Sequence, residues 1–139
     1  MNKVGFTVLA LLLTVGTAAA ATLTVVVTDC ENDQGIVTVA LYNDDTRQDF
    51  GSDRGYYQGK QADIANGAAK VIFTDIPPGR YAVAAFHDLD RSGALKKNFW
   101  GIPQEKYGFS NNYGKRPDFP QASFLVSGDL EISIQLQWY

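Results

Sequence analysis

The side chains that could do chemistry are concentrated between Phe86 and Phe119, a stretch rich in acids, amides, glycines and aromatic rings. Three oxygen-bearing residues stand at alternate positions near its start, Asp88, Asp90 and Ser92, and Gly93 follows them. A calcium-binding loop begins in this way, because oxygens at alternate positions converge on a hard cation and the glycine permits a sharp turn. The pattern therefore predicts Asp88, Asp90 and Ser92 as metal ligands, with calcium as the cation.

The rest of the calcium pattern is missing. The twelfth position counted from Asp88 is Phe99, where such a loop has a bidentate glutamate, and Lys96 and Lys97 bring positive charge close by. Glu105 could supply a carboxylate from farther along the chain. The alternative without a metal is that the aspartates accept hydrogen bonds from turn amides, as side-chain caps do. No other cofactor is expected.

A hydrolytic triad can be written from His87, Asp88 and Ser110. His87 is the single histidine of the chain, and the string around Ser110 lacks the final glycine of a nucleophile elbow. Neighbouring residues of a strand point to opposite faces, so His87 and Asp88 would not face one substrate together. We therefore expect no enzymatic activity, and a small hydrolase that uses these three residues is the alternative.

Aromatic rings gather in the second half of the same stretch, where positions 99–119 hold six of the chain's seventeen Phe, Tyr and Trp residues. Rings at this density, with amides and hydroxyls beside them, can stack on a sugar or line a groove. The alternative is a loop that packs on itself and covers one end of the fold. We predict a recognition surface for a small molecule, a glycan or an envelope protein, formed by Trp100, Glu105, Tyr107, Phe109, Ser110, Asn111, Asn112 and Tyr113.

In the segments that must position these residues, apolar side chains recur with a period of two residues rather than 3.6, and β-branched side chains are frequent. Both features indicate β-strands. Turn signals separate them, including Asn66-Gly67 and the Pro77-Pro78-Gly79 string. The expected strands cover 22–29, 36–42, 58–64, 68–75, 81–87, 122–127 and 130–138.

This pattern predicts an all-β fold, an antiparallel β-sandwich of about seven strands of immunoglobulin-like or prealbumin-like kind, with one long ordered loop. Tyr81 directly follows a turn, so we expect its ring in the core and its hydroxyl bonded to nearby backbone.

The N-terminus predicts export. Lys3 precedes a largely apolar run and then small residues that include an Ala-x-Ala pattern. The run is shorter than the about 20 residues of a membrane span. We expect residues 1–21 to be a signal peptide cleaved near Ala20 or Ala21, and 22–139 to be one domain, periplasmic or secreted and not integral to a membrane.

The charge of the chain limits the classes of partner that it could bind, and its cysteine content limits how it can be stabilised. Without Lys3 the chain holds 11 basic and 15 acidic residues, a net charge of −4, with no run of like charges. This argues against nucleic acid or an anionic membrane as partner. Cys30 is the single cysteine, so packing rather than an internal disulfide must stabilise the domain, and we expect Cys30 to be at least half-buried.

Four strings carry a resemblance to a family: Gly-x-Val-x-Val-Ala-Leu-Tyr at 35–42, Ile-Pro-Pro-Gly-x-Tyr-Ala-Val at 76–83, Phe-His-Asp at 86–88 and Gly-Ile-Pro-x-Glu-x-Tyr-Gly-Phe-Ser-Asn-Asn at 101–112. With them the chain resembles the bacterial family known as domain of unknown function 2141, over nearly all of residues 22–139. The resemblance implies an envelope or secreted β-sandwich without an assigned activity. The family usually has Asp where this chain has Lys96, which weakens the case for a metal.

The predicted function is therefore that of a non-enzymatic binding or structural module of the bacterial envelope, with 86–119 as its recognition surface. The hydrolase and a calcium-stabilised module are the alternatives.

Overall fold

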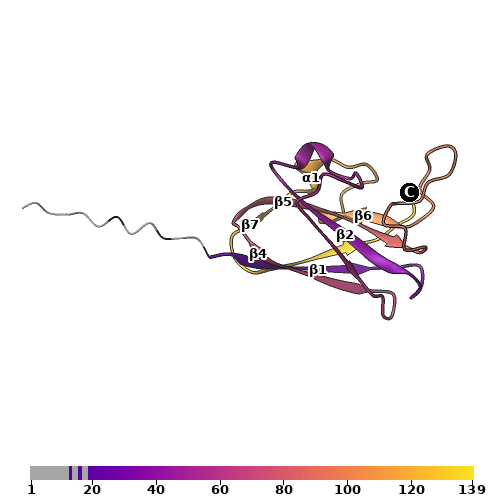
Figure 1. The fold of residues 1–139 in the computed structure, drawn as a ribbon, viewed down its shortest axis with the longest axis horizontal. Helices are drawn as coiled ribbons and strands as arrows, with labels where there is room; N and C mark the ends of the chain where they lie inside the picture. Colours follow the sequence, from indigo (N-terminus) through magenta and orange to yellow (C-terminus); the bar gives the residue numbers. More distant parts are fainter. Residues whose placement is uncertain (1–12, 14–15, 17–18) are drawn as a thin grey trace, which may run out of the picture.

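Figure 1 shows two facing sheets in a computed structural model, which describes residues 13, 16 and 19–139. The eight strands found in these residues confirm the predicted β-sandwich. Most of the predicted signal peptide, residues 1–21, lies outside the described part of the chain. In that described part, no helix is both long enough and apolar enough to cross a membrane.

The smaller sheet has the order β4-β1-β8 and consists of β1 (Ala21–Thr28), β4 (Ala69–Ile76) and β8 (Leu130–Gln135). Strand β1 pairs with β4 antiparallel but with β8 in parallel, which differs from a wholly antiparallel sandwich. The preceding strand, β7, belongs to the other sheet, so the chain crosses between sheets and enters β8 in the direction of β1. Alternation of side chains carries no information on that direction.

The larger sheet has the order β3-β2-β5-β6, with β7 also paired to β5. Its strands are β2 (Ile36–Asn43), β3 (Gln58–Ala62), β5 (Gly79–Asp88), β6 (Tyr107–Phe109) and β7 (Phe124–Val126). Strand β6 lies inside the predicted loop. With only three residues, it is too short to show a period of two.

The main core lies between the sheets. Val37, Val39 and Leu41 of β2 point into it and are fully buried, as their alternation predicts. The Tyr81 ring is buried there, and its hydroxyl donates to the Pro77 carbonyl at 2.6 Å, which confirms the predicted corner residue. Cys30 is also buried, as expected.

A second, smaller core covers one end of the outer face of the larger sheet. It consists of Tyr42, Phe50, Ala82, Phe109, Phe119 and Ala122. Three short helices lie over it: η1 (Arg47–Asp49), η2 (Ser110–Asn112) and α1 (Phe119–Ala122).

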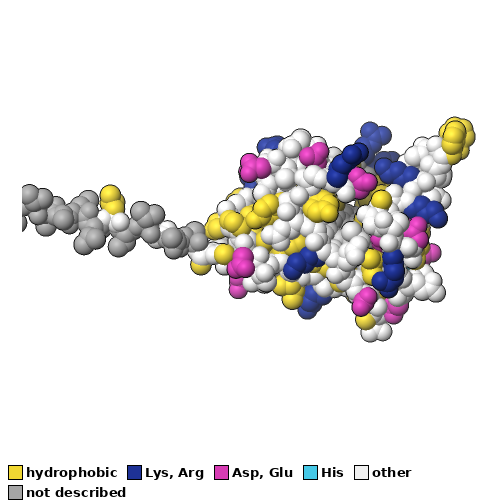
Figure 2. Space-filling model, in the orientation of Figure 1, with side chains coloured by type: hydrophobic (Ala, Val, Ile, Leu, Met, Phe, Trp, Pro, Cys, Tyr) yellow, Lys and Arg dark blue, Asp and Glu magenta, His cyan; other side chains and the backbone are white. Residues whose placement is uncertain are grey.

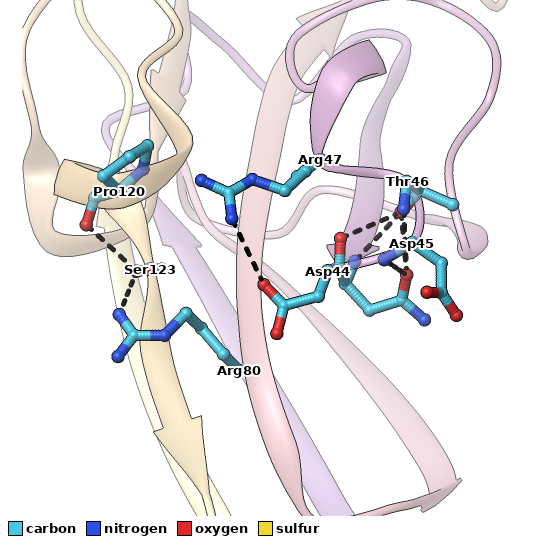
Figure 3. Close-up of polar contacts among 8 residues, drawn as sticks. Asp44, Asp45, Thr46, Arg47, Arg80, Pro120 and Ser123 are labelled. Carbon is cyan, nitrogen blue, oxygen red and sulfur yellow. Dashed lines mark hydrogen bonds and ion pairs between the residues drawn. The ribbon is translucent and has the colours of Figure 1, made fainter.

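Polar contacts hold these covering segments in place (Figure 3). Arg80 donates to the Ser123 hydroxyl at 3.0 Å, and that hydroxyl donates to the Pro120 carbonyl at 3.0 Å, which ties the end of α1 to β5. On the η1 side, Arg47 pairs with Asp44 at 3.8 Å. The predicted long loop is therefore a folded cap at its C-terminal end.

Candidate functional site

An open cleft of about 310 Å³ lies on the outer face of the larger sheet, beside the second core. Its floor consists of Thr38 and Ala40 from β2 and of Ala84 and Phe86 from β5, all half-buried. Three of these side chains are small, and strands β2 and β5 pair directly at these positions. A floor of small residues on rigid strands leaves room for a bound molecule.

The walls of the cleft come from three loops and from strand β6. Gly51, Ser52 and Asp53 form one side, and Lys115 with Pro117 closes an end. A Cβ atom at Gly51 would lie 2.5 Å from Cβ of Pro117, and its φ of +85° also favours glycine. Two segments far apart in the sequence therefore meet there because position 51 has no side chain.

The opposite wall belongs to the predicted recognition stretch. Tyr107 and Phe109 of β6 line the cleft together with Leu95, Lys97 and Pro103. The Tyr107 hydroxyl donates to the Lys115 carbonyl at 2.6 Å, and burial raises the pKa of this phenol. Tyr107 is therefore held rigidly, with its ring edge on Phe109 at a centroid distance of 5.8 Å.

Three carboxylates converge where β5 ends. Oxygen atoms of Asp88, Asp90 and Glu105 lie within 4.8 Å of one another, so Glu105 joins the two predicted aspartates from fifteen residues beyond Asp90. The cluster consists of hard oxygen ligands, the type that calcium takes. The predicted ligand Ser92 lies beside it, but its hydroxyl donates to the Ala94 carbonyl at 3.0 Å.

The two buried carboxylates of this cluster already accept backbone hydrogen bonds at all four oxygens. Asp88 accepts from the amides of Ser92 and Gly93 at 2.9 and 2.8 Å. Glu105 accepts from the amides of Leu89 and Lys96 at 3.0 and 2.9 Å. These carboxylates act as caps that fold the loop, as the alternative without a metal describes.

Asp90 is the exposed member of the cluster, and its hydrogen bond with Ser92 lowers the pKa of its carboxyl. Calcium takes six to eight oxygens, and the side-chain cluster supplies three carboxylates. The calcium-stabilised module therefore stays a prediction.

His87 is fully buried and makes two hydrogen bonds with the turn before β2. Its Nδ1 accepts from the Glu31 amide at 3.2 Å, so its Nε2 carries the hydrogen and donates to the Gln34 carbonyl at 2.6 Å. Both ring nitrogens are engaged with backbone, so the imidazole has no free atom with which to act as a base.

Ser110 is also fully buried, and it bonds elsewhere. Its hydroxyl donates to the Ala122 carbonyl at 2.6 Å and accepts from the Val83 amide at 2.9 Å. No hydrogen bond joins it to His87 among the described residues, and the Asp88 carboxylate bonds loop amides instead. The three residues of the hydrolase alternative thus take part in three separate sets of structural contacts.

The two predicted amide contacts hold η2 against its neighbours. Asn111 donates to the carbonyls of Gln121 and Ser123, both at 3.0 Å, and Asn112 accepts from the Gln135 amide at 2.8 Å. Both asparagines have positive φ, of 60° and 47°. Asparagine is common in that conformation. The backbone conformation and the hydrogen bonds therefore explain why asparagine stands at both positions.

Trp100 and Tyr113, the remaining predicted recognition residues, reach solvent outside the cleft lining. Trp100 is 80% exposed at the tip of the loop between β5 and β6, and Tyr113 is 37% exposed beside the segment that closes the cleft. The predicted surface is therefore divided among the cleft wall, the buried cap contacts and an exposed tip.

The other half of the cleft was not predicted from the sequence. Thr38, Ala40 and Ala84 have no chemistry of their own, and the 51–53 wall lies in a segment interpreted only as a connection. Their signal is weak: small residues on the outward positions of two long strands, where a sandwich usually carries larger polar side chains.

Comparison with known families gives one finding. The model of a family described as "Uncharacterized protein conserved in bacteria (DUF2141)" matches residues 25–134. We found no match to the chain among curated proteins or among solved structures.

Proposed function

The chain belongs to DUF2141, a family of uncharacterised bacterial proteins, and we propose that it is an exported, non-enzymatic binding module. Its ligand is a small amphipathic molecule with an apolar ring and a negative group, held in the outer cleft. The observation that carries the proposal is the cleft itself, because more than half of its lining comes from the 86–119 stretch.

The shape and chemistry of the cleft support a ring-bearing ligand. Its volume of about 310 Å³ is at the lower end of the range of ligand pockets, roughly 300–1,000 Å³. The floor is apolar at Ala40 and Ala84, and aromatic surface comes from Phe86 in the floor and from Tyr107 on the wall. A ring that lies over the alanines can contact both aromatic side chains.

The charges of the lining support an anionic group on the ligand. Lys97 and Lys115 line the cleft, and Asp53 is the one acidic residue in the lining. Neither lysine has an ion-pair partner among the ion pairs of the described residues. A carboxylate, sulfonate or phosphate between the two lysines would therefore meet a local excess of positive charge.

The absence of enzymatic chemistry in this proposal rests on His87 and Ser110. Both are buried away from solvent, and their polar atoms bond backbone groups. A hydrolase needs these atoms free to reach a substrate. The proposal of export is supported by the N-terminal pattern of charge, apolar run and small residues, which is typical of proteins sent to the periplasm or out of the cell.

The test uses 1-anilinonaphthalene-8-sulfonate, a fluorescent probe with apolar rings and one negative group. We expect saturable binding of one probe per chain, measured by fluorescence titration. Ala40→Leu fills the floor of the cleft and should abolish binding. Lys97→Gln with Lys115→Gln should weaken binding by roughly fivefold, because two surface charges are lost.

Ser133→Leu is the matched control, since Ser133 is exposed on β8 of the other sheet and the substitution adds the same side chain. It should bind the probe as the wild type does. Near-UV circular dichroism of each variant separates cleft binding from binding to a loosened core. Unchanged binding in folded Ala40→Leu would refute the cleft as the site.

A further inference from the structure

The two most exposed large apolar side chains of residues 19–139, Phe99 and Trp100, stand at the tip of the loop between β5 and β6, and Ile102 lies beside them. Phe99 is 93% exposed, Trp100 80% and Ile102 49%. The rings of Phe99 and Trp100 meet edge to face at 5.3 Å, so each ring mainly contacts the other. Figure 2 shows an apolar knob that stands out at one end of the molecule, with Lys and Arg side chains on the surface near it.

This tip is a closed hairpin rather than a loose loop. Lys97 and Pro103 form a β-bridge, and the amides of Asn98 and Gly101 donate to the Ile102 and Asn98 carbonyls at 2.9 and 3.0 Å. The Asn98 side chain accepts from the amides of Trp100 and Ile102 as well. Phe99 and Trp100 therefore occupy the middle of a turn whose backbone is held by its own hydrogen bonds.

Large aromatic side chains are unusual at the middle of a turn, where polar residues and glycine prevail. Nothing in the fold of the hairpin requires them, because its hydrogen bonds come from the backbone and from Asn98. Leaving a Phe or Trp ring in water forgoes the favourable free energy that burial of its apolar surface would contribute. The exposed rings thus indicate a surface that covers them in use.

The charge around the tip is positive. Lys96 and Lys97 directly precede the hairpin turn and are exposed, and positions 96–104 contain no acidic residue. Lys115 lines the same cleft as Lys97. The nearest acid in the sequence, Glu105, is buried and accepts two backbone amides. Residues 96–104 therefore carry two positive charges and no negative one. The pKa of the exposed Asp90 carboxyl is lowered by its hydrogen bond with Ser92 and also by Lys96, which lies close to it.

We propose that this hairpin docks on an anionic lipid bilayer, with Phe99, Trp100 and Ile102 in the headgroup region and Lys96 and Lys97 against the lipid phosphates. Trp and Phe side chains beside lysines are typical of segments that lie in a membrane interface. The proposal goes beyond ligand binding in the cleft, and each can hold without the other.

The size of the tip favours a bilayer over a protein partner. Its two aromatic side chains bury about 150–250 Å² each when covered, whereas a stable protein interface buries about 800 Å² on each side. The tip also projects from the domain, so a flat partner would contact little else (Figure 2). A bilayer accepts a narrow, projecting group because the lipids move aside.

The experiment measures vesicle binding of the wild type and of four variants. Sedimentation with phosphatidylcholine vesicles that contain 30% phosphatidylglycerol should bind the wild type, and pure phosphatidylcholine should bind it severalfold more weakly. Phe99→Ala with Trp100→Ala should reduce binding at least about tenfold. Lys96→Gln with Lys97→Gln should reduce it by about fivefold per lysine at low salt.

Two controls make the result specific. Ile72→Ala and Leu125→Ala remove apolar side chains that are 45% and 67% exposed on other strands, and both should bind as the wild type does. In a Trp138→Phe background, Trp100 is the one tryptophan left, so its emission should shift to the blue and brominated lipids should quench it.

Three outcomes would overturn the proposal. One is unchanged vesicle binding after removal of the two rings. Another is equal binding to neutral and anionic vesicles. The third is self-association of the wild type in sedimentation velocity that the ring variant abolishes, since the rings would then cover a second copy of the chain. All variants alter exposed side chains, so their melting temperatures should match that of the wild type.

Discussion

Replacing Glu105 by Gln tests whether buried carboxylates fold the loop that carries both the cleft wall and the tip. The side chain is 1% exposed, and its two oxygens accept from the amides of Leu89 and Lys96 at 3.0 and 2.9 Å. Glutamine has the same shape but keeps only one acceptor. Its NH₂ group must face one of the two backbone N–H donors.

The cost follows from the hydrogen bonds. One bond to a charged acceptor is lost, which is about 1.5–3 kcal/mol, and a backbone N–H is left without a partner in a part-buried site, at about 1–3 kcal/mol. The remaining bond also changes from a charged to a neutral acceptor. Relief of the buried charge offsets part of this loss. We therefore expect the free energy of unfolding to fall by about 2–4 kcal/mol.

Urea unfolding monitored by circular dichroism measures the global change, and amide hydrogen exchange locates it. The Leu89 and Lys96 amides should exchange at least roughly thirtyfold faster, and the Val39 amide in β2 gives the factor that the loss of global stability accounts for. Glu131→Gln is the matched control, because Glu131 is exposed on β8. A loss below about 0.5 kcal/mol with unchanged exchange at Leu89 and Lys96 would refute the capping role.

Three further predictions concern other parts of the chain. Burial raises the pKa of Tyr42 to about 12, so the unfolded chain loses this proton first above about pH 10. Stability should therefore fall by roughly 2–3 kcal/mol between pH 10 and 12. Thermal melts of Tyr42→Phe should show a smaller loss, the part that comes from other phenols with raised pKa values such as Tyr81 and Tyr107. If the domain is a calcium-stabilised module, calcium should raise the melting temperature of the wild type and a chelator should lower it. Asp88→Asn should respond to neither reagent. An unchanged melting temperature of the wild type with both reagents would refute this hypothesis. Strand β1 begins at Ala21, which is 2% exposed. Signal-peptide cleavage after Ala20 would therefore leave the strand intact. The mass of the exported protein should show that its first residue is Ala21.

The sandwich was predictable because a strand with one buried face has an apolar residue at every second position. Val37, Val39 and Leu41 needed only their spacing to be placed in the core. Tyr81 needed only its position after a proline-glycine turn. The direction of β8 and the existence of β6 were not predictable, since both depend on pairings between segments far apart in the chain.

The candidate site was predictable in part, for the same reason. Asp88 and Asp90 were expected as a pair from spacing alone, but the approach of Glu105 depends on how the intervening hairpin folds back. Ser110 carries a hydroxyl that looks reactive in the sequence, and only the contacts with Val83 and Ala122 explain its burial. Local pattern thus identifies candidate atoms, while packing decides which of them are free.

By itself the sequence determined that the chain forms two packed sheets, because the hydrophobic effect acts on a period that can be counted along it. It also determined that the unusual chemistry lies between 86 and 119. Only the tertiary structure decided how that stretch divides, with polar groups turned inward to the backbone, Tyr107 and Phe109 on a cleft wall, and Phe99 and Trp100 in solvent. The physical reason is that the burial of each side chain depends on neighbouring residues that lie far from it along the sequence and meet it only in the folded chain.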